Sequence, residues 1–176
     1  MTQMVEATDR LAERLISEGQ KTCAFFEALS SDQLEQALYT AGAGWTIRQA
    51  LAHFVAAEAG FRQIMEDILA GGTGAPEQFD LETYNDKHVA MLADTPAAEL
   101  IVQFRFQRQM NINLVQKMTS ADLLKTGRHP YLGMTSMQEI IQLLYRHNQI
   151  HQRDIRRMLA GSQDQQAQPG DMHGVS

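Results

Sequence analysis

The sequence predicts an all-α domain that folds as a four-helix bundle. Apolar residues recur at steps of three and four along several long segments, whereas almost no segment alternates apolar and polar residues as a half-buried strand does. Four of these segments are long enough to pack side by side. The chain has 176 residues, 44% of them hydrophobic, which suffices for one core but not comfortably for two. We therefore expect one domain over residues 1–160 and a separate tail over residues 161–176.

The first long helix is expected from Thr2 to Leu29, with only Gly19 weakening its apolar pattern. A short helical segment, SSDQLEQAL, follows it. Here Ser30 and Gln33 have the spacing of a capping box, in which each side chain bonds the other residue's free backbone amide. The glycine-rich stretch TAGAG then ends the helical pattern.

The second long helix begins in the stretch WTIRQA. Thr46 can cap its free amides and Gln49 can return the bond, which is again the spacing of a capping box. The stretch GGTGAP marks the end of this helix. Its apolar stripe consists of Ile47, Leu51, Phe54, Phe61, Met65 and Ile68.

A shorter helix over residues 79–93 is the extra segment of the bundle. The third long helix follows at DTPAAEL, where Thr95 can act as the cap. Pro96 suits the first helical position because its missing N–H would have no partner there anyway. We expect this helix to last to about Met118.

The last helix follows the loop KTGRHPYLGM and is expected to begin at Thr135, which has Gln138 three residues later. It runs through SMQEIIQLLYRHNQIHQRDIRRML and ends near residue 160. The remaining stretch, GSQDQQAQPGDMHGVS, has no periodic apolar face, so burial cannot offset the entropy lost on ordering. Residues 161–176 are therefore predicted to be a flexible polar tail.

Composition and charge argue against several classes of protein. The formal net charge of −6 disfavours nucleic-acid binding, which needs concentrated Lys and Arg. No stretch reaches the ~20 continuous apolar residues of a membrane span, and the N-terminus lacks the basic and apolar segments of a secretory signal. We expect a cytoplasmic protein with no membrane partner. Cys23 is the only cysteine, and its apolar neighbours favour a small core residue.

The motif HNQIH places two histidines four residues apart on the last helix. Because residues advance ~100° each around an α-helix, His147 and His151 differ by only ~40° and share a face. The apolar residues of the helix point the same way, so both imidazoles should face the interior. Burying both without partners is costly, whereas a metal cation accepts one neutral nitrogen from each. The pair therefore predicts a metal site.

His53, in LAHFVAAE, is the best third ligand. It lies ~110° from the centre of the apolar stripe of its helix, at a boundary between core and surface that suits a side chain reaching into a cleft. Three imidazoles from two helices leave coordination positions open for water or substrate, as a catalytic site requires. By itself, His53 can also be read as a boundary histidine.

Two acidic residues compete for the same ion. Glu58 points ~140° away from His53 on the same helix, so it is predicted to be a buried acid paired with a polar group elsewhere in the bundle. Asp154 lies one turn after His151, where it can orient the imidazole, ligate directly or remain a solvated surface acid.

Other polar residues have simpler interpretations. Tyr84 and His88 share a face of the short helix, and His129 precedes a proline in a loop, so all three are predicted to be ordinary surface residues. The inward face of the third long helix carries polar residues that can bind a polar co-substrate, form buried hydrogen bonds or contact a dimer partner: Gln107, Arg108 and Asn111.

Two stretches, GWTIRQALAHFVAAE and HPYLGMTSMQEIIQLLYRHNQIHQRDIRRML, resemble the DinB-like metal-binding four-helix bundles. The likeness consists of a Trp followed by a capped helix with a histidine, then a Gly and a Thr before a last helix with His-x-x-x-His. It implies that His53, His147 and His151 form the metal triad of that family. The implied ion is divalent, with nickel or zinc first and manganese or iron as further candidates.

The resemblance implies a range of activities, because fold does not select among them. Similar proteins include transferases and isomerases that use mycothiol or bacillithiol, the DinB-like part of ergothioneine-forming enzymes, and a hydrolase-like group. The stretch FDLETYNDKHVAML also resembles a subgroup with an aromatic-Asn segment near the cleft, although no catalytic role is carried over to Tyr84 or Asn85. Similar proteins often dimerise, so a homodimer is expected.

Three functional hypotheses follow. The first is a metal-dependent transferase or hydrolase that joins a low-molecular-weight thiol, or water, to an electrophilic small molecule. The second is a noncatalytic metal-binding or ligand-binding stress-response protein whose ion stabilises the bundle. In the third, the histidines bind no metal.

Overall fold

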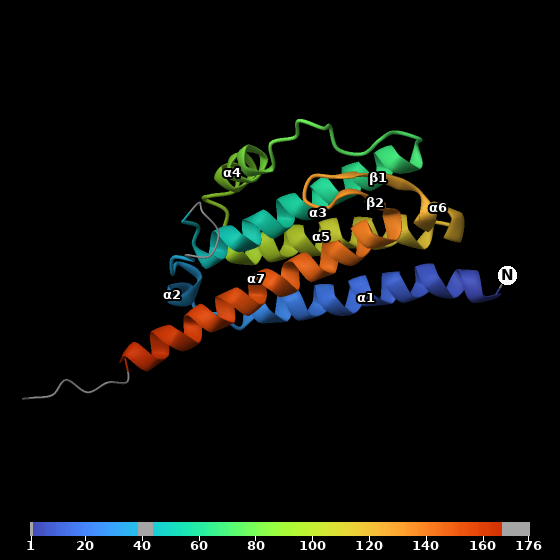
Figure 1. Cartoon of the computed structure of the whole chain (residues 1–176). Coiled ribbons are helices and arrows are strands. Elements are labelled where there is room, and N and C mark those ends of the chain that lie inside the picture. The colour runs from blue at the N-terminus through green and yellow to red at the C-terminus, as the bar shows by residue number, and fades with distance from the viewer. Residues whose placement is uncertain (1, 39–43, 167–176) are drawn as a thin grey trace, which may run out of the picture.

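The computed structural model describes residues 2–38 and 44–166. Within these ranges four long helices pack side by side and confirm the predicted four-helix bundle (Figure 1). These helices are α1 (Thr2–Glu27), α3 (Ile47–Leu69), α5 (Ala97–Gln116) and α7 (Met137–Gln166). None of the helices in these ranges combines the length and apolar character that crossing a membrane would require.

The order of the helices around the bundle differs from their order in the chain. α1 packs against α5 and α7, and α3 packs against the same two helices. The consecutive long helices α1 and α3 therefore lie diagonally across the bundle, as do α5 and α7. This arrangement brings α3 and α7, the helices with the candidate ligands, into direct contact.

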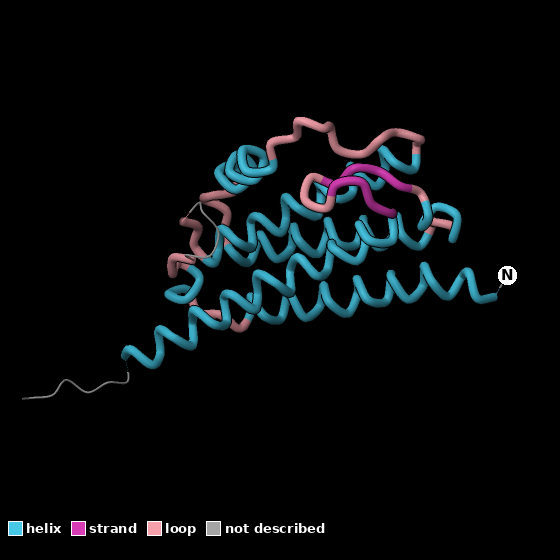
Figure 2. The backbone as a smooth tube through the Cα atoms, in the orientation of Figure 1, coloured by secondary structure: helices cyan, strands magenta, loops and turns pink. Residues whose placement is uncertain are grey.

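Four shorter pieces of structure connect the long helices (Figure 2). The helix α4 (Leu81–Met91) confirms the short helix expected over residues 79–93, and α2 (Ser31–Leu34) lies in the expected SSDQLEQAL segment. The helix α6 (Ser120–Leu124) and a hairpin were not predicted. The hairpin pairs β1 (Thr126–His129) with β2 (Gly133–Ser136), so the prediction of a plain loop there is wrong. Strands of four residues are too short to show a recognisable alternation.

Capping confirms two of the predicted helix starts and corrects two others. The capping boxes of Ser30 with Gln33 and of Thr46 with Gln49 are both formed. Thr95 does not cap α5, because Pro96 occupies the cap position and no side chain bonds the free amides.

The start of α7 also differs from the prediction. Thr135 belongs to β2, and the capping bonds are made one residue later, where the Glu139 N–H donates to Ser136 Oγ and the Ser136 N–H donates to Glu139 Oε2. At its other end α7 continues to Gln166, so the prediction that this helix ends near residue 160 is wrong, and residues 167–176 of the predicted tail lie outside the described residues.

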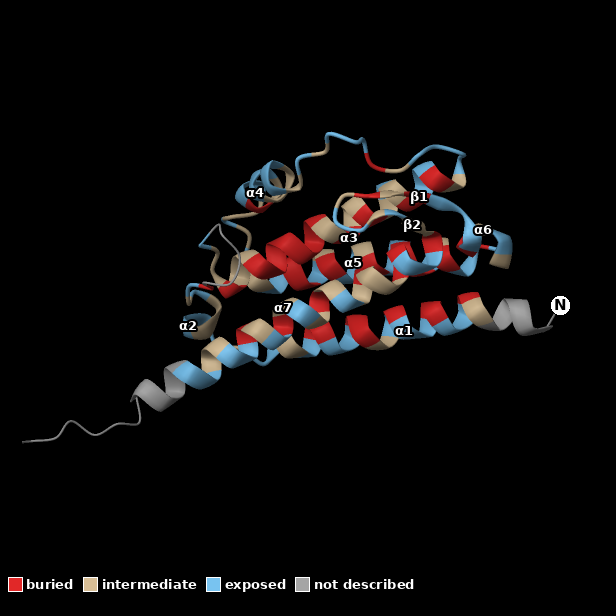
Figure 3. Cartoon of the chain, viewed as in Figure 1, coloured by how far each residue is buried: buried red, intermediate tan, exposed pale blue. Residues whose placement is uncertain are grey.

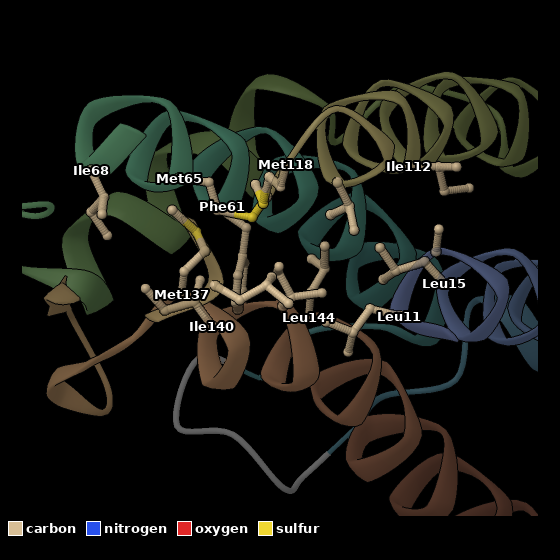
Figure 4. Packing of buried hydrophobic residues seen from close by; sticks show 14 residues of the cluster. Leu11, Leu15, Phe61, Met65, Ile68, Ile112, Met118, Met137, Ile140 and Leu144 are labelled. Carbon is tan, nitrogen blue, oxygen red and sulfur yellow. The ribbon is translucent and has the colours of Figure 1, made fainter. Parts of the chain in front are cut away.

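The core lies where the long helices face one another (Figure 3). All four long helices contribute to one cluster, in which Leu15, Met65, Val115 and Ile140 are fully buried (Figure 4). A second cluster contains Phe26, Phe54 and Phe104, with Phe26 and Phe54 in an edge-to-face contact at 5.7 Å between ring centroids. Cys23 belongs to this second cluster, which confirms it as a small core residue, and burial raises the pKa of its thiol.

Two glycines hold the hairpin against the end of α3. Gly74 has φ +83, and a Cβ there would lie 2.5 Å from the carbonyl oxygen of Arg128, so only glycine fits without movement of backbone. The Arg128 N–H donates to the Thr73 carbonyl (2.7 Å), and the Ala75 N–H donates to the Arg128 carbonyl (2.8 Å). Gly127 packs directly on Ile68 of α3. These contacts fix the end of β1, where His129 lies.

Candidate metal centre

The structure brings together the three histidines predicted as ligands. His53 Nε2 lies 2.8 Å from His147 Nε2, and His151 Nε2 lies 3.2 Å from the same atom. A ligand atom from each of the three residues can be chosen so that all lie within 4.8 Å of one another. The rings of His147 and His151 are nearly perpendicular, at 84°, so their Nε2 atoms approach one point from different directions.

Local packing explains this convergence. His147 and His151 lie one turn apart on α7, and His53 faces them from α3. Phe54 lies against both α7 histidines, with its ring centroid 5.7 Å from each imidazole, and Trp45 covers His53 at 5.0 Å. His53 is only 5% exposed, so its predicted place at the boundary of the core is wrong. Neighbours outside its own helix, which helical periodicity does not reveal, cover that side of α3.

Burial keeps the three imidazoles uncharged. It lowers the pKa of His53 to about 3, with a smaller contribution from repulsion by His151. The pKa of His147 is held well below its ordinary value by burial first and then by repulsion from His53 and His151. Burial also lowers the pKa of His151, and the negative charge of Asp154 opposes that shift. At neutral pH all three rings are therefore neutral and can offer a lone pair.

The donor set fits a divalent metal ion. Nitrogens at 2.0–2.1 Å from a tetrahedral ion lie roughly 3.3–3.4 Å apart. The 3.2 Å between the Nε2 atoms of His147 and His151 is close to this value, and the 2.8 Å between those of His53 and His147 is shorter. Without a proton or a cation between them, converging lone pairs at this distance repel. The Nδ1 atoms of His53 and His147 are buried and have no partner among the described residues. Coordination through Nε2 would leave the ring proton on Nδ1, where metal-ligating histidines commonly donate to an acceptor, and no described residue supplies that acceptor for His53 or His147.

The triad lies on the wall of a cavity of about 510 Å³. Aromatic rings form much of this wall, with contributions from Trp45, Phe61, Phe79, Tyr84 and Tyr131. The remaining lining is mostly aliphatic, with a few polar side chains. The size and composition of this cavity are typical of sites that bind small organic molecules.

His129 also lines the cavity, contrary to the prediction that it is an ordinary surface residue. It is 5% exposed, and its ring lies 4.8 Å from that of Phe61. Burial lowers the pKa of His129 to about 4. The sequence carries no signal for this placement, because it depends on where the hairpin packs against α3.

The short helix α4 contributes part of the same wall. Tyr84 and Asn85 line the cavity, so for Tyr84 the prediction of an ordinary surface residue is wrong. A Cβ on Gly60 would lie 3.2 Å from Tyr84 Oη, so the glycine leaves room for the tyrosine against α3. The ring of His88 lies 4.0 Å from that of Tyr84 at a tilt of 33°, and its Nδ1 bonds the Tyr84 carbonyl, outside the cavity lining. Asp154 forms ion pairs with Arg153 and Arg157 on the surface and does not join the triad.

Glu58 is the buried, paired acid that its position on α3 predicts. It is fully buried, and Arg108 Nε donates to both of its carboxylate oxygens at 3.0 Å. Asn111 Nδ2 donates to Glu58 Oε2 at 2.7 Å, while Gln107 accepts from Arg62. For Arg108 and Asn111, this favours buried hydrogen bonds over the other interpretations of the inward polar residues. Neither lies on the cavity wall.

Comparisons with known proteins support the same fold. A family model described as the DinB superfamily matches residues 9–155. A comparison of the sequence with curated proteins found no match.

Several solved structures resemble this one at low sequence identity. YfiT from Bacillus subtilis, described as a "probable metal-dependent hydrolase with an unusual four-helix bundle topology", has a TM-score of 0.70 at 18% identity, over 86% of this chain and 87% of YfiT. A mutant of the mycothiol-dependent maleylpyruvate isomerase has a TM-score of 0.67 at 11% identity, over 84% of this chain and 60% of the isomerase. The colibactin self-resistance protein ClbS, in complex with a double-stranded DNA, has a TM-score of 0.65 at 12% identity, over 85% of this chain and 95% of ClbS. These similarities show the fold.

Proposed function

The chain belongs to the DinB superfamily, and on that basis we propose that it is a metal-dependent transferase or hydrolase. In this proposal its substrate is an electrophilic small molecule, and the nucleophile is a low-molecular-weight thiol or water. The observation that carries the proposal is the convergence of three neutral imidazoles on the wall of a cavity lined mostly by aromatic and aliphatic side chains.

His53, His147 and His151 are the proposed ligands of a divalent ion, with nickel or zinc ahead of manganese or iron. An ion held by three nitrogens supplies a Lewis acid, which lowers the pKa of a coordinated water or thiol and yields a nucleophile at neutral pH. The protein contributes neutral donors held in place by the ring of Phe54. All three lie on the cavity wall, so substrate and ligands share one space.

The cavity wall binds and orients the apolar body of the substrate. Trp45 and Phe61 lie in contact with triad histidines, and Tyr84 lies on the α4 side of the space. These rings exclude water from the apolar part of the substrate and leave the reactive group near the three nitrogens. Two proteins of similar fold support this choice between water and a thiol, since YfiT is described as a probable metal-dependent hydrolase and the maleylpyruvate isomerase as mycothiol-dependent.

Metal content is the decisive first test. We would measure it by inductively coupled plasma mass spectrometry on tag-free protein, for the wild type, His151→Ala and His88→Ala. His88 lies outside the triad, so His88→Ala controls for the loss of any histidine. We expect about one ion per chain in the wild type and in His88→Ala, and almost none in His151→Ala. Equal metal content in His151→Ala and the wild type would remove the basis of the proposal.

Activity is tested with the same samples and a panel of low-molecular-weight thiols and electrophiles. Turnover that disappears in His151→Ala and persists in His88→Ala supports the enzyme. Metal-dependent stabilisation without turnover supports the second candidate, a noncatalytic metal-binding or ligand-binding protein of the stress response. One observation favours that candidate: Asp67 is the one carboxylate among the described cavity residues, and its Oδ2 already accepts from the Gly74 N–H at 2.8 Å, so the described wall offers few candidates for a general base.

We also propose a homodimer, which size-exclusion chromatography with light scattering would test. Val102, Phe106 and Met110 are exposed at successive turns of α5 and offer an apolar stripe for such a contact. Nucleic acid is not a proposed partner despite the DNA complex of ClbS, since the net charge of −6 opposes phosphate binding.

A further inference from the structure

His129 is a buried polar side chain on the cavity wall that the proposed chemistry does not use. It is the last residue of β1, and its ring packs on Phe61, which in turn lies 6.3 Å from the ring of His147. It is not one of the three clustered ligands. Its position nevertheless places it beside any molecule that reaches the triad through the cavity.

Backbone hydrogen bonds determine which nitrogen of His129 carries the proton. The N–H of Tyr131 donates to Nδ1 at 3.1 Å, and the N–H of Leu132 approaches the same atom at 3.4 Å. A backbone amide can only donate, so Nδ1 is the acceptor. Burial keeps this ring neutral at neutral pH. The single proton of the neutral ring therefore resides on Nε2.

The Nε2–H group is free to bind a ligand. No described residue accepts a hydrogen bond from Nε2–H. Nε2 is nevertheless not a fully buried atom without a partner, so it keeps contact with solvent although the residue as a whole is only 5% exposed. The space that remains open to His129 is the cavity that it lines.

The donor is also rigidly held. Arg128, the preceding residue, exchanges backbone hydrogen bonds with Thr73 and Ala75, and His129 itself pairs with Gly133 at the end of the hairpin. A donor that is already oriented loses little entropy when it binds an acceptor, which is the requirement for a specificity-determining group.

The cavity indicates what kind of acceptor His129 meets. Among the described residues on its wall there is no Lys or Arg, and the one carboxylate, Asp67, disfavours an anionic ligand. The other polar side chains besides the histidines include Gln63, Tyr84, Asn85 and Tyr131. Such a wall suits an aromatic or aliphatic body with an uncharged oxygen acceptor, such as a carbonyl group.

We propose that His129 is a substrate-binding residue, whose Nε2–H donates a hydrogen bond to a carbonyl oxygen of an apolar or aromatic molecule in the cavity. This inference rests on the proposed function only in taking the cavity as the substrate site. His129 then orients the carbonyl group relative to the three clustered histidines. Its role is to select and position the substrate, and metal binding is independent of it.

The test is a binding cycle with two matched probes, followed by ¹⁹F NMR on the protein as purified. The probe 4-fluoroacetophenone carries the carbonyl oxygen, and 4-fluoro-α-methylstyrene replaces that oxygen with a methylene group of similar shape. The variant His129→Asn retains an acceptor near the position of Nδ1, and its shorter side chain leaves no donor at the position of Nε2. The variant His129→Gln places an amide nitrogen near the position of Nε2 and removes the acceptor for the Tyr131 and Leu132 amides.

We expect His129→Asn to weaken binding of the ketone about fivefold and to leave the alkene within about twofold, since one net hydrogen bond is lost. His129→Gln should restore ketone binding, although the Tyr131 and Leu132 amides exchange faster in this variant. Equal losses for both probes, or an unchanged affinity for the ketone, would overturn the proposal. So would a loss in His129→Gln equal to that in His129→Asn, because His129 would then only support the hairpin.

The outcome is separate from that of the proposed function. Metal content and thiol-dependent turnover are measured on the same preparations, and His129→Asn should keep the full metal content. Selective loss of ketone binding without any turnover would support His129 as a binding residue and count against the enzyme. Turnover with ketone binding unchanged in His129→Asn would do the reverse.

Discussion

Replacing Arg108 with methionine should destabilise the bundle severely. The guanidinium makes two bonds of 3.0 Å from Nε to the oxygens of Glu58, a further short contact from one terminal nitrogen to Oε1, and a bond of 3.2 Å to the Leu15 carbonyl. Methionine keeps most of the apolar stem and removes all of these donors. Glu58, which has no exposed surface, is left with Asn111 as its side-chain partner.

The expected cost is about 3–5 kcal/mol of unfolding free energy, because an uncompensated charge stays buried. Urea unfolding followed by circular dichroism at 222 nm measures this cost. A control on the same helix is Arg105→Met, which removes an ion pair between the half-exposed Arg105 and Glu27 and should cost less than about 1 kcal/mol.

The double variant Glu58→Gln with Arg108→Met tests the cause. Neutralising the carboxyl group removes the buried charge, so the double variant should regain a large part of the stability lost by Arg108→Met. If Arg108→Met costs no more than Arg105→Met, or if the double variant regains nothing, then the reasoning from buried charge is wrong.

Three further predictions concern the hairpin, the metal and acid. Gly74→Ala should lower the free energy of unfolding by about 2–3 kcal/mol, because the new Cβ meets the Arg128 backbone and the residue has a positive φ. The control Gly71→Ala also has a positive φ but lies in open space, so urea unfolding should show a loss of only about 1 kcal/mol. Zinc at 100 times its Kd should stabilise the wild type by about 2.7 kcal/mol, seen by calorimetry as a Tm rise of roughly 5–10 °C that His147→Ala abolishes. Folding lowers the pKa of His129 to about 4, so as the pH decreases the unfolded chain binds a proton at this residue before the folded chain does. The free energy of unfolding therefore decreases as the pH falls below about 6.5. Between pH 7 and 5 the metal-free wild type should therefore lose about 2 kcal/mol more than His129→Asn in urea unfolding, and an equal loss would refute the assignment.

Local patterns account for most of the successful predictions. The four helical segments and the capping boxes at Ser30 and Thr46 were predicted correctly, because a helix and its cap depend on residues at most four positions apart. The caps at Thr95 and Thr135 failed because neighbouring residues, Pro96 and Ser136, occupy the positions concerned. Both errors concern one residue at a helix end, where such predictions are least exact.

Gly19 interrupts the apolar pattern of its helix for a reason that lies in another helix. In the sequence it only interrupts the apolar pattern of α1. In the structure a Cβ on Gly19 would lie 3.0 Å from Cγ of Arg108, so the glycine leaves room for the side chain that crosses from α5 to Glu58. Residues that are remote in the chain decide the identity of this position.

The sequence by itself determined the four long helices, the shared face of His147 and His151 and the pairing of Glu58 with a buried polar group, because helical periodicity encodes which side chains share a face. Only the tertiary structure decided that α3 packs against α7, that His53 is buried beside the pair, and that a hairpin carries His129 to the same cavity. These outcomes depend on how faces of different helices match in shape. That match is a property of the packed core as a whole and is not contained in any one segment.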